Sequence, residues 1–238
     1  MIRLCWVRGG TLDRKEPEAY KVGRLLPSDL ARMEALCREG AKLDAANGYF
    51  PTMLATVQFA GLRDAEALNA LHDASVCDTW EDYAYQQGTG ARDLLIRSFG
   101  DRGLIMHALP SAAILLSHLR PIRQSAMLAV SAADKARASG DLQLEHRTRT
   151  DVIRLGSLMR RNADTLIGRL FGASVEDLGF GAEADADGLL STKPPTARAA
   201  GDRAAYAARL REEAPALSAE IDRELSSLER FLVVKQQY

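Results

Sequence analysis

Residues 141–171 read DLQLEHRTRTDVIRLGSLMRRNADTLIGRLF, and the rest of the chain can be arranged around this run. It contains no proline, and its apolar residues recur at spacings of three and four, which places them along one side of an α-helix. Asp141 is a suitable N-cap and Gly172 a suitable stop, so the pattern predicts a single helix of roughly 45 Å at about 1.5 Å per residue. The apolar stripe of this helix consists of Val152, Leu155, Met159, Ala163, Leu166 and Leu170.

The opposite side of the predicted helix, here named the arginine face, is rich in basic residues. The planar guanidinium group suits phosphate, so this face indicates an acidic ligand, with DNA or RNA as candidates. A run of charges on a helix is also commonly a solvated surface. On both interpretations the side chains face solvent, and replacing Arg149, Arg160 and Arg161 together by Ala should leave folding nearly intact. The arginine face comprises Arg147, Arg149, Arg154, Arg160, Arg161 and Arg169, opposed by Glu145, Asp151 and Asp164.

The composition is that of a globular protein that favours helices. Of 238 residues, 47% are apolar and 26% charged, while aromatic residues make up only 6%. The apolar content relies on Ala and Leu, which favours helix packing over a β-sandwich or barrel. The net charge of −1 provides no overall attraction for nucleic acid or membrane, so any basic surface must be local.

Cysteine usage and hydropathy predict a cytoplasmic protein. Cys5, Cys37 and Cys77 are far apart and in no paired spacing, which favours free thiols over a disulfide framework or a zinc site. Residues 1–10 are too few and too charged for a signal peptide. The most apolar run, residues 103–119, contains two histidines and a proline and falls short of the ~20 residues that a membrane span needs.

The chain divides into four predicted parts. Residues 1–26 form a small β element, because Ile2, Leu4 and Trp6 alternate with polar neighbours before a Gly-Gly turn. Residues 27–178 form the helical core domain, and residues 179–201 form a linker rich in Gly, Asp and Pro. Residues 202–238 form C-terminal amphipathic helices with a break at Pro215. The predicted fold is thus mainly α, a multi-helix bundle-like domain with an N-terminal β-hairpin and a linker-tethered C-terminal helix.

The core of the bundle is predicted from apolar positions at helical spacing. These positions are Leu30, Met33, Leu36, Val57, Leu68, Leu71, Ile114, Leu115, Leu119, Leu128, Val152, Leu155, Met159 and Leu166.

A second apolar stripe lies near the C-terminus. Its residues follow helical spacing, and little of the chain remains beyond them to cover it. We expect it to dock on the domain itself or on a partner helix, in pairing of the coiled-coil type. The stripe consists of Leu217, Ile221, Leu225, Leu228 and Leu232.

Two groups of residues could carry metal-dependent chemistry. His72-Asp73 is the dipeptide used by helical metal-dependent phosphohydrolases, but no histidine precedes it to complete a ligand set. Asp78, Glu81 and Asp82 crowd together, either for acid–base chemistry or as the negative first turn of a helix, which we favour. Joined, the two groups would make the site of a metal-dependent phosphoesterase.

Two further motifs are incomplete. Residues 183–188 imitate the opening of a calcium loop, but Pro194 stands where the closing bidentate glutamate belongs, so a solvated acidic linker is the better interpretation. Gly88-Thr-Gly90 lacks the remaining residues of a nucleotide fingerprint or phosphate loop and predicts a flexible turn.

No complete catalytic set, cofactor motif or metal-ligand set is present in the sequence. We therefore expect a non-catalytic helical adaptor or assembly subunit of a multi-subunit complex, binding a protein partner or self-associating through its amphipathic helices. The first alternative is a nucleic-acid-contacting subunit that uses the arginine face. The second is the metal-dependent phosphoesterase.

Overall fold

The computed structural model describes residues 27–100, 119–181 and 197–235, and every regular element in these ranges is an α-helix. This confirms the predicted mainly α, bundle-like class. The β-hairpin predicted within residues 1–26 lies outside the described residues. The helices are α1 (Pro27–Leu43), α2 (Tyr49–Ala60), α3 (Asp64–Ser75), α4 (Ala84–Phe99), α6 (Leu119–Ala138), α7 (Leu142–Asn162), α8 (Leu166–Gly179), α9 (Ala197–Glu213) and α10 (Pro215–Lys235).

The predicted single helix over residues 141–171 is wrong, because the chain breaks into α7 and α8. Asp141 is the N-cap of α7 as expected, and its side chain accepts a hydrogen bond from Leu144 N. Ala163 then adopts an extended backbone, and the Thr165 side chain accepts a hydrogen bond from the backbone N–H of Gly168. This second N-cap starts α8 and satisfies a free donor at its first turn.

Glycines let α8 fold back closely against α7. A Cβ on Gly172 would lie 2.4 Å from Arg160 N, and one on Gly156 would lie 2.3 Å from Glu176 N. Real Cβ atoms cannot approach backbone atoms so closely, so only glycine allows this helix pair its spacing. Gly172 therefore lies inside α8 as a packing residue, and the expectation that it stops a helix is wrong.

The main core lies between α2, α3, α6, α7 and α8. Two predicted core residues are exposed instead: Leu36, with 56% of its surface accessible on the edge helix α1, and Leu166, which follows the break after α7. Ile114 and Leu115 lie outside the described residues. Leu30, Met33, Leu68 and Leu128 are half-buried. The predicted core residues that are buried are Val57, Leu71, Leu119, Val152, Leu155 and Met159.

A second core joins the C-terminal hairpin of α9 and α10 to the body. The hairpin turns at Ala214, and α10 begins at Pro215, the predicted break. Ile221 and Leu228 of α10 are buried in this core together with Ile153 of α7. The other three residues of the C-terminal stripe, Leu217, Leu225 and Leu232, are partly buried and pack against the same cluster.

The predicted linker is partly helical. α8 extends to Gly179 and α9 begins at Ala197, so helices occupy both ends of residues 179–201. Residues 182–196, including the calcium-like motif at 183–188, lie outside the described residues.

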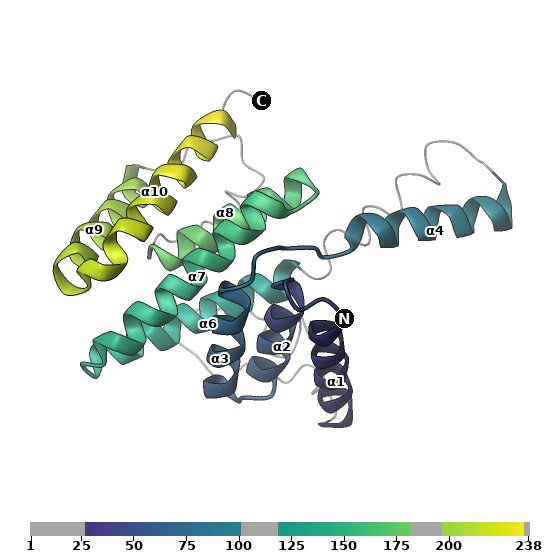
Figure 1. Ribbon diagram of the computed structural model, residues 1–238, viewed down its shortest axis with the longest axis horizontal. Coiled ribbons are helices and arrows are strands. Elements are labelled where there is room, and N and C mark those ends of the chain that lie inside the picture. The colour runs from purple at the N-terminus through teal and green to yellow at the C-terminus, as the bar shows by residue number, and fades with distance from the viewer. Residues whose placement is uncertain (1–26, 101–118, 182–196, 236–238) are drawn as a thin grey trace.

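Figure 1 shows α7 and α8 in the middle of the molecule, with α1, α2 and α3 on one side and the α9–α10 hairpin along the other. Helix α4 extends away from the other labelled helices and packs extensively against none of the described ones. None of the helices described has the length and apolar character required to cross a membrane.

Candidate functional site

The C-terminal hairpin docks on part of the arginine face. Arg154 Nη2 lies 2.6 Å from Glu220 Oε2 of α10. Arg161 lies 3.6 Å from Glu224, and the Ser157 hydroxyl between them donates a hydrogen bond to the same carboxylate. Acidic residues of the hairpin therefore pair with Arg154 and Arg161 of the arginine face.

The expectation that all six arginines face solvent is wrong for two of them. Arg149 and Arg160 are buried, because they point between α7 and its neighbours instead of away from the bundle. Arg147, Arg161 and Arg169 are exposed, and Arg154 is half-buried. Nucleic-acid binding by the exposed arginines stays a prediction.

Arg160 forms a buried ion pair with α8. Its Nε lies 2.7 Å from Glu176 Oε2, its Nη1 donates to Ser227 of α10, and its guanidinium lies over the ring of Phe231. Burial raises the pKa of Glu176, while the hydrogen bond from Arg160 and its positive charge oppose this rise. Arg160 thus links α7, α8 and α10.

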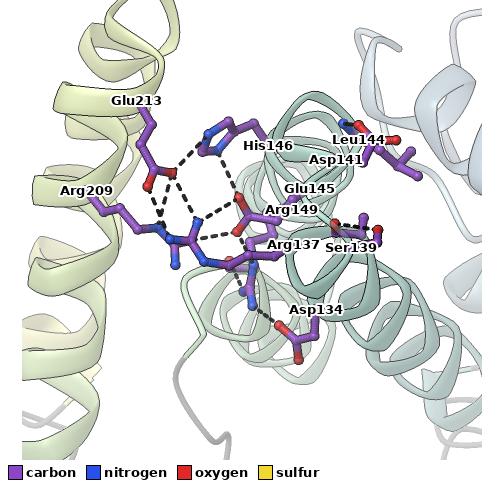
Figure 2. Close-up of polar contacts among 12 residues, drawn as sticks. Asp134, Arg137, Ser139, Asp141, Leu144, Glu145, His146, Arg149, Arg209 and Glu213 are labelled. Carbon is purple, nitrogen blue, oxygen red and sulfur yellow. Dashed lines mark hydrogen bonds and ion pairs between the residues drawn. The ribbon is translucent and has the colours of Figure 1, made fainter.

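A second ionic cluster surrounds Glu145, the charged residue at the start of α7 (Figure 2). Glu145 is fully buried, and its carboxylate accepts a hydrogen bond of 2.6 Å from Arg209 of α9. Arg149 Nε lies 3.1 Å from the same oxygen. Arg137 of α6 reaches Glu213 with two hydrogen bonds of 3.1 Å, which hold the pKa of Glu213 below its ordinary value. The cluster therefore joins α6, α7 and α9 through paired charges.

His146 lies between the two carboxylates of this cluster. Its Nδ1 is 3.2 Å from Glu145 Oε2 and its Nε2 is 3.2 Å from Glu213 Oε2. The three side chains could offer ligand atoms within 4.8 Å of one another to a metal ion. However, Arg137 and Arg209 already hydrogen-bond these carboxylates, and their positive charges oppose a divalent cation. These residues therefore fit a structural cluster of ion pairs better than a metal site.

A groove of about 420 Å³ lies beside this cluster, between α3, α7 and the turn from α9 to α10. One polar side of α7 forms its floor, since residues 143, 146, 147, 150, 151 and 154 follow helical spacing. His72 borders it on α3, while Glu213, Ala214 and Leu217 border it on the hairpin. Two arginines of the arginine face, Arg147 and Arg154, line this groove.

His72 is held at the groove by a buried carboxylate. Its Nδ1 lies 3.0 Å and 3.1 Å from the two carboxylate oxygens of Asp151, which is buried in α7. Ser75 donates a hydrogen bond of 2.9 Å to the same carboxylate. Arg147 Nε lies 3.9 Å from it. Asp151 therefore fixes the ring of His72, with Nδ1 turned inward, beside the guanidinium of Arg147.

The acidic group after α3 lies just before α4, whose first turn contains no acidic residue, so the predicted negative first turn is not present there. Asp82 Oδ1 accepts a hydrogen bond of 3.0 Å from Ala84 N, and Glu81 Oε1 accepts one of 2.9 Å from Tyr83 N. Burial raises the pKa of Glu81. His72 turns toward Asp151 and is not hydrogen-bonded to this group in the part of the chain that the structure describes.

The base of α4 is anchored to the body. The Tyr83 hydroxyl donates a hydrogen bond of 2.7 Å to Asp44, and Trp80 is buried in the main core. Tyr83 adopts a left-handed backbone with φ of 56°, which sets the direction in which α4 leaves. The predicted turn at Gly88-Thr-Gly90 is wrong, because these residues lie within α4.

Helix α4 exposes large apolar side chains beyond this base. Tyr85, Leu94 and Phe99 are exposed, and Leu94 leaves 65% of its surface accessible. Gly90 lies one turn before Leu94 on the same side of the helix, with open space where its Cβ would be. The outer side of α4 thus carries a protruding leucine beside a glycine gap.

Comparison with protein-family models, with curated protein sequences and with solved structures found no match. Function is therefore argued from the geometry of the described residues.

Proposed function

We propose that the chain is a non-catalytic assembly subunit that self-associates through α4. The observation that carries this proposal is an anchored helix that leaves the bundle and exposes Leu94 next to Gly90. A helix of this length is marginal in water when it stands alone, and each interior glycine costs about 1 kcal/mol relative to alanine. Contact with another surface would add packing to α4, which packs extensively against none of the other described helices.

A second copy of the chain fits the outer side of α4 because that side is self-complementary. In an antiparallel pair of α4 helices that cross near Arg92, Leu94 of each copy lies opposite Gly90 of the other. A two-fold axis repeats every contact, so Leu94 of each copy fills the gap at Gly90 of the other copy.

The arrangement of the polar clusters also supports a structural role. The buried charges around Glu145 and Glu176 are paired with arginines of neighbouring helices. Paired buried charges of this kind hold helices in register, and both carboxylates accept hydrogen bonds from these arginines.

Sedimentation velocity over a concentration series tests the proposal on the full chain. Wild-type protein should sediment as a dimer at high concentration, while Leu94→Asp and Gly90→Leu should remain monomeric. Gly90→Leu is informative because leucine is the better helix former, so a loss of association would not arise from an unfolded α4. Leu62→Asp, at an exposed position on the body, should associate like the wild type. A wild-type protein that stays monomeric throughout, or α4 variants that dimerise normally, would overturn the proposal.

A further inference from the structure

The groove beside α7 carries polar groups that neither the bundle nor the assembly role uses. Thr150 is only 1% exposed and lines the groove, yet its hydroxyl has no hydrogen-bond partner among the described residues. Buried polar atoms are nearly always paired, and an unpaired one in a cavity wall indicates a missing partner. A ligand in the groove would provide one.

The neighbouring residues give the groove a preference for an oxyanion. The Arg147 side chain is 46% exposed at the groove, with one long hydrogen bond of 3.4 Å to Asn69 and the 3.9 Å contact with Asp151. Its guanidinium therefore keeps donors for a ligand. His72 uses Nδ1 for Asp151, which leaves Nε2 available to a bound ligand. Both side chains line the groove and are oriented by the same carboxylate.

The acidic groups near the groove each have partners within the protein. Asp151 is in contact with His72, Ser75 and Arg147. Glu213 pairs with Arg137, and Arg154 is balanced by Glu220. An anion at Arg147 therefore meets no unpaired carboxylate in the groove wall.

The groove also has apolar lining residues. Leu142 lies at the start of α7, and Ala214 and Leu217 lie at the turn between α9 and α10. A volume of about 420 Å³ exceeds what a free inorganic anion needs and lies within the range typical of small-molecule sites.

From this arrangement we infer that the groove binds a small phosphate monoester with an apolar body. The phosphate contacts Arg147, His72 and the Thr150 hydroxyl, and the organic group lies against Leu142 and Leu217. Phosphate suits the site because its several oxygens can accept from a guanidinium and a hydroxyl at once. This inference goes beyond the assembly role and does not depend on α4.

Isothermal titration calorimetry on the full chain at low ionic strength tests it, with inorganic phosphate, phenyl phosphate and benzoate as probes. Phenyl phosphate should bind more tightly than inorganic phosphate, because its ring adds apolar contact, and more tightly than benzoate. Arg147→Gln should weaken both phosphates by about tenfold or more, the size expected for loss of a charged hydrogen bond. Arg161→Gln, an exposed arginine of the same helix outside the groove, should bind like the wild type.

A second variant distinguishes a loss of binding from a loss of folding. Gln143 is exposed, lines the groove and lies in the first turn of α7, where Gln143→Glu is favourable for the helix. This change should weaken both phosphates through repulsion. The inference is overturned if the wild type binds neither phosphate, if benzoate binds as tightly as phenyl phosphate, or if both groove variants bind like the wild type. An equal loss of binding in Arg161→Gln would overturn it as well.

Discussion

Arg154 of α7 and Glu220 of α10, 66 residues apart in the chain, form a two-point ion pair in which the guanidinium Nη2 lies 2.6 Å from the carboxylate Oε2. Arg154 and Glu220 are both partly exposed, so the pair lies at the rim of the second core and not inside it. Apolar contacts of Ile221 and Leu228 lie behind it. The pair therefore sets the position of α10 along α7, while the apolar contacts supply most of the attraction.

Replacing Arg160 should strongly destabilise the fold. Arg160→Ala leaves the buried Glu176 without its partner, and loss of one member of a buried ion pair costs about 3–5 kcal/mol. Arg161→Ala removes an exposed side chain from the next position and should cost within ~0.5 kcal/mol. Chemical denaturation of both variants gives the free energies of unfolding. Equal, small losses in the two variants would show that Arg160 is not buried as described.

Close packing of α7 on α8 predicts a strict requirement for glycine at position 156. In Gly156→Ala, the new Cβ would lie 2.3 Å from the backbone nitrogen of Glu176, so the two helices must separate, at a cost of at least ~1–3 kcal/mol. The matched control is Gly201→Ala in α9, which meets nothing within 4 Å. That change should stabilise the protein by up to ~1 kcal/mol through helix propensity. Melting temperatures should therefore move in opposite directions, and a shift in the same direction would contradict the helix spacing.

Acid should weaken the docking of the hairpin. Hydrogen bonds from Arg137 and Arg154 hold the pKa values of Glu213 and Glu220 below the ordinary value of 4.5. A carboxylate with a lowered folded pKa contributes stability that is present above its unfolded pKa and is lost as the pH falls through the folded pKa. The stability difference between wild type and Glu220→Gln should thus be constant at neutral pH and shrink below about pH 4.5.

Denaturation of the two proteins at a series of pH values measures this difference. Glu229→Gln, at an exposed position of α10, serves as the control and should parallel the wild type throughout. A difference that grows on acidification would show that Glu220 is not held as its carboxylate by Arg154.

The helical class, the N-cap at Asp141 and the break at Pro215 could be predicted because each depends on local sequence. Composition and spacing report on helix formation, and a capping side chain acts within one turn. The break after α7 could not be predicted in the same way. Ala163 keeps the apolar spacing intact, so periodicity continues across a point where the backbone changes direction.

The partners and burial of the arginines depend on tertiary structure and could not be predicted from the sequence. A charged residue on the polar side of a helix is expected in solvent, but Arg160 finds its partner on the returning helix α8 and Arg154 on α10. Glu145 and Asp151 are buried for the same reason, since Arg209 of α9 pairs with Glu145 and His72 of α3 lies in hydrogen-bonding contact with Asp151. One available signal was the series Gly156, Gly172 and Gly179, which marks a close helix contact.

The most direct measurement of hairpin docking on the arginine face is a double-mutant cycle on Arg154 and Glu220. Free energies of unfolding are measured for the wild type, Arg154→Ala, Glu220→Ala and the double variant. The two losses should be non-additive by at least ~0.5 kcal/mol, as expected for residues in one ion-pair network. Losses that add within ~0.3 kcal/mol would mean that α10 does not bind the arginine face, and that those arginines are left facing solvent or another partner.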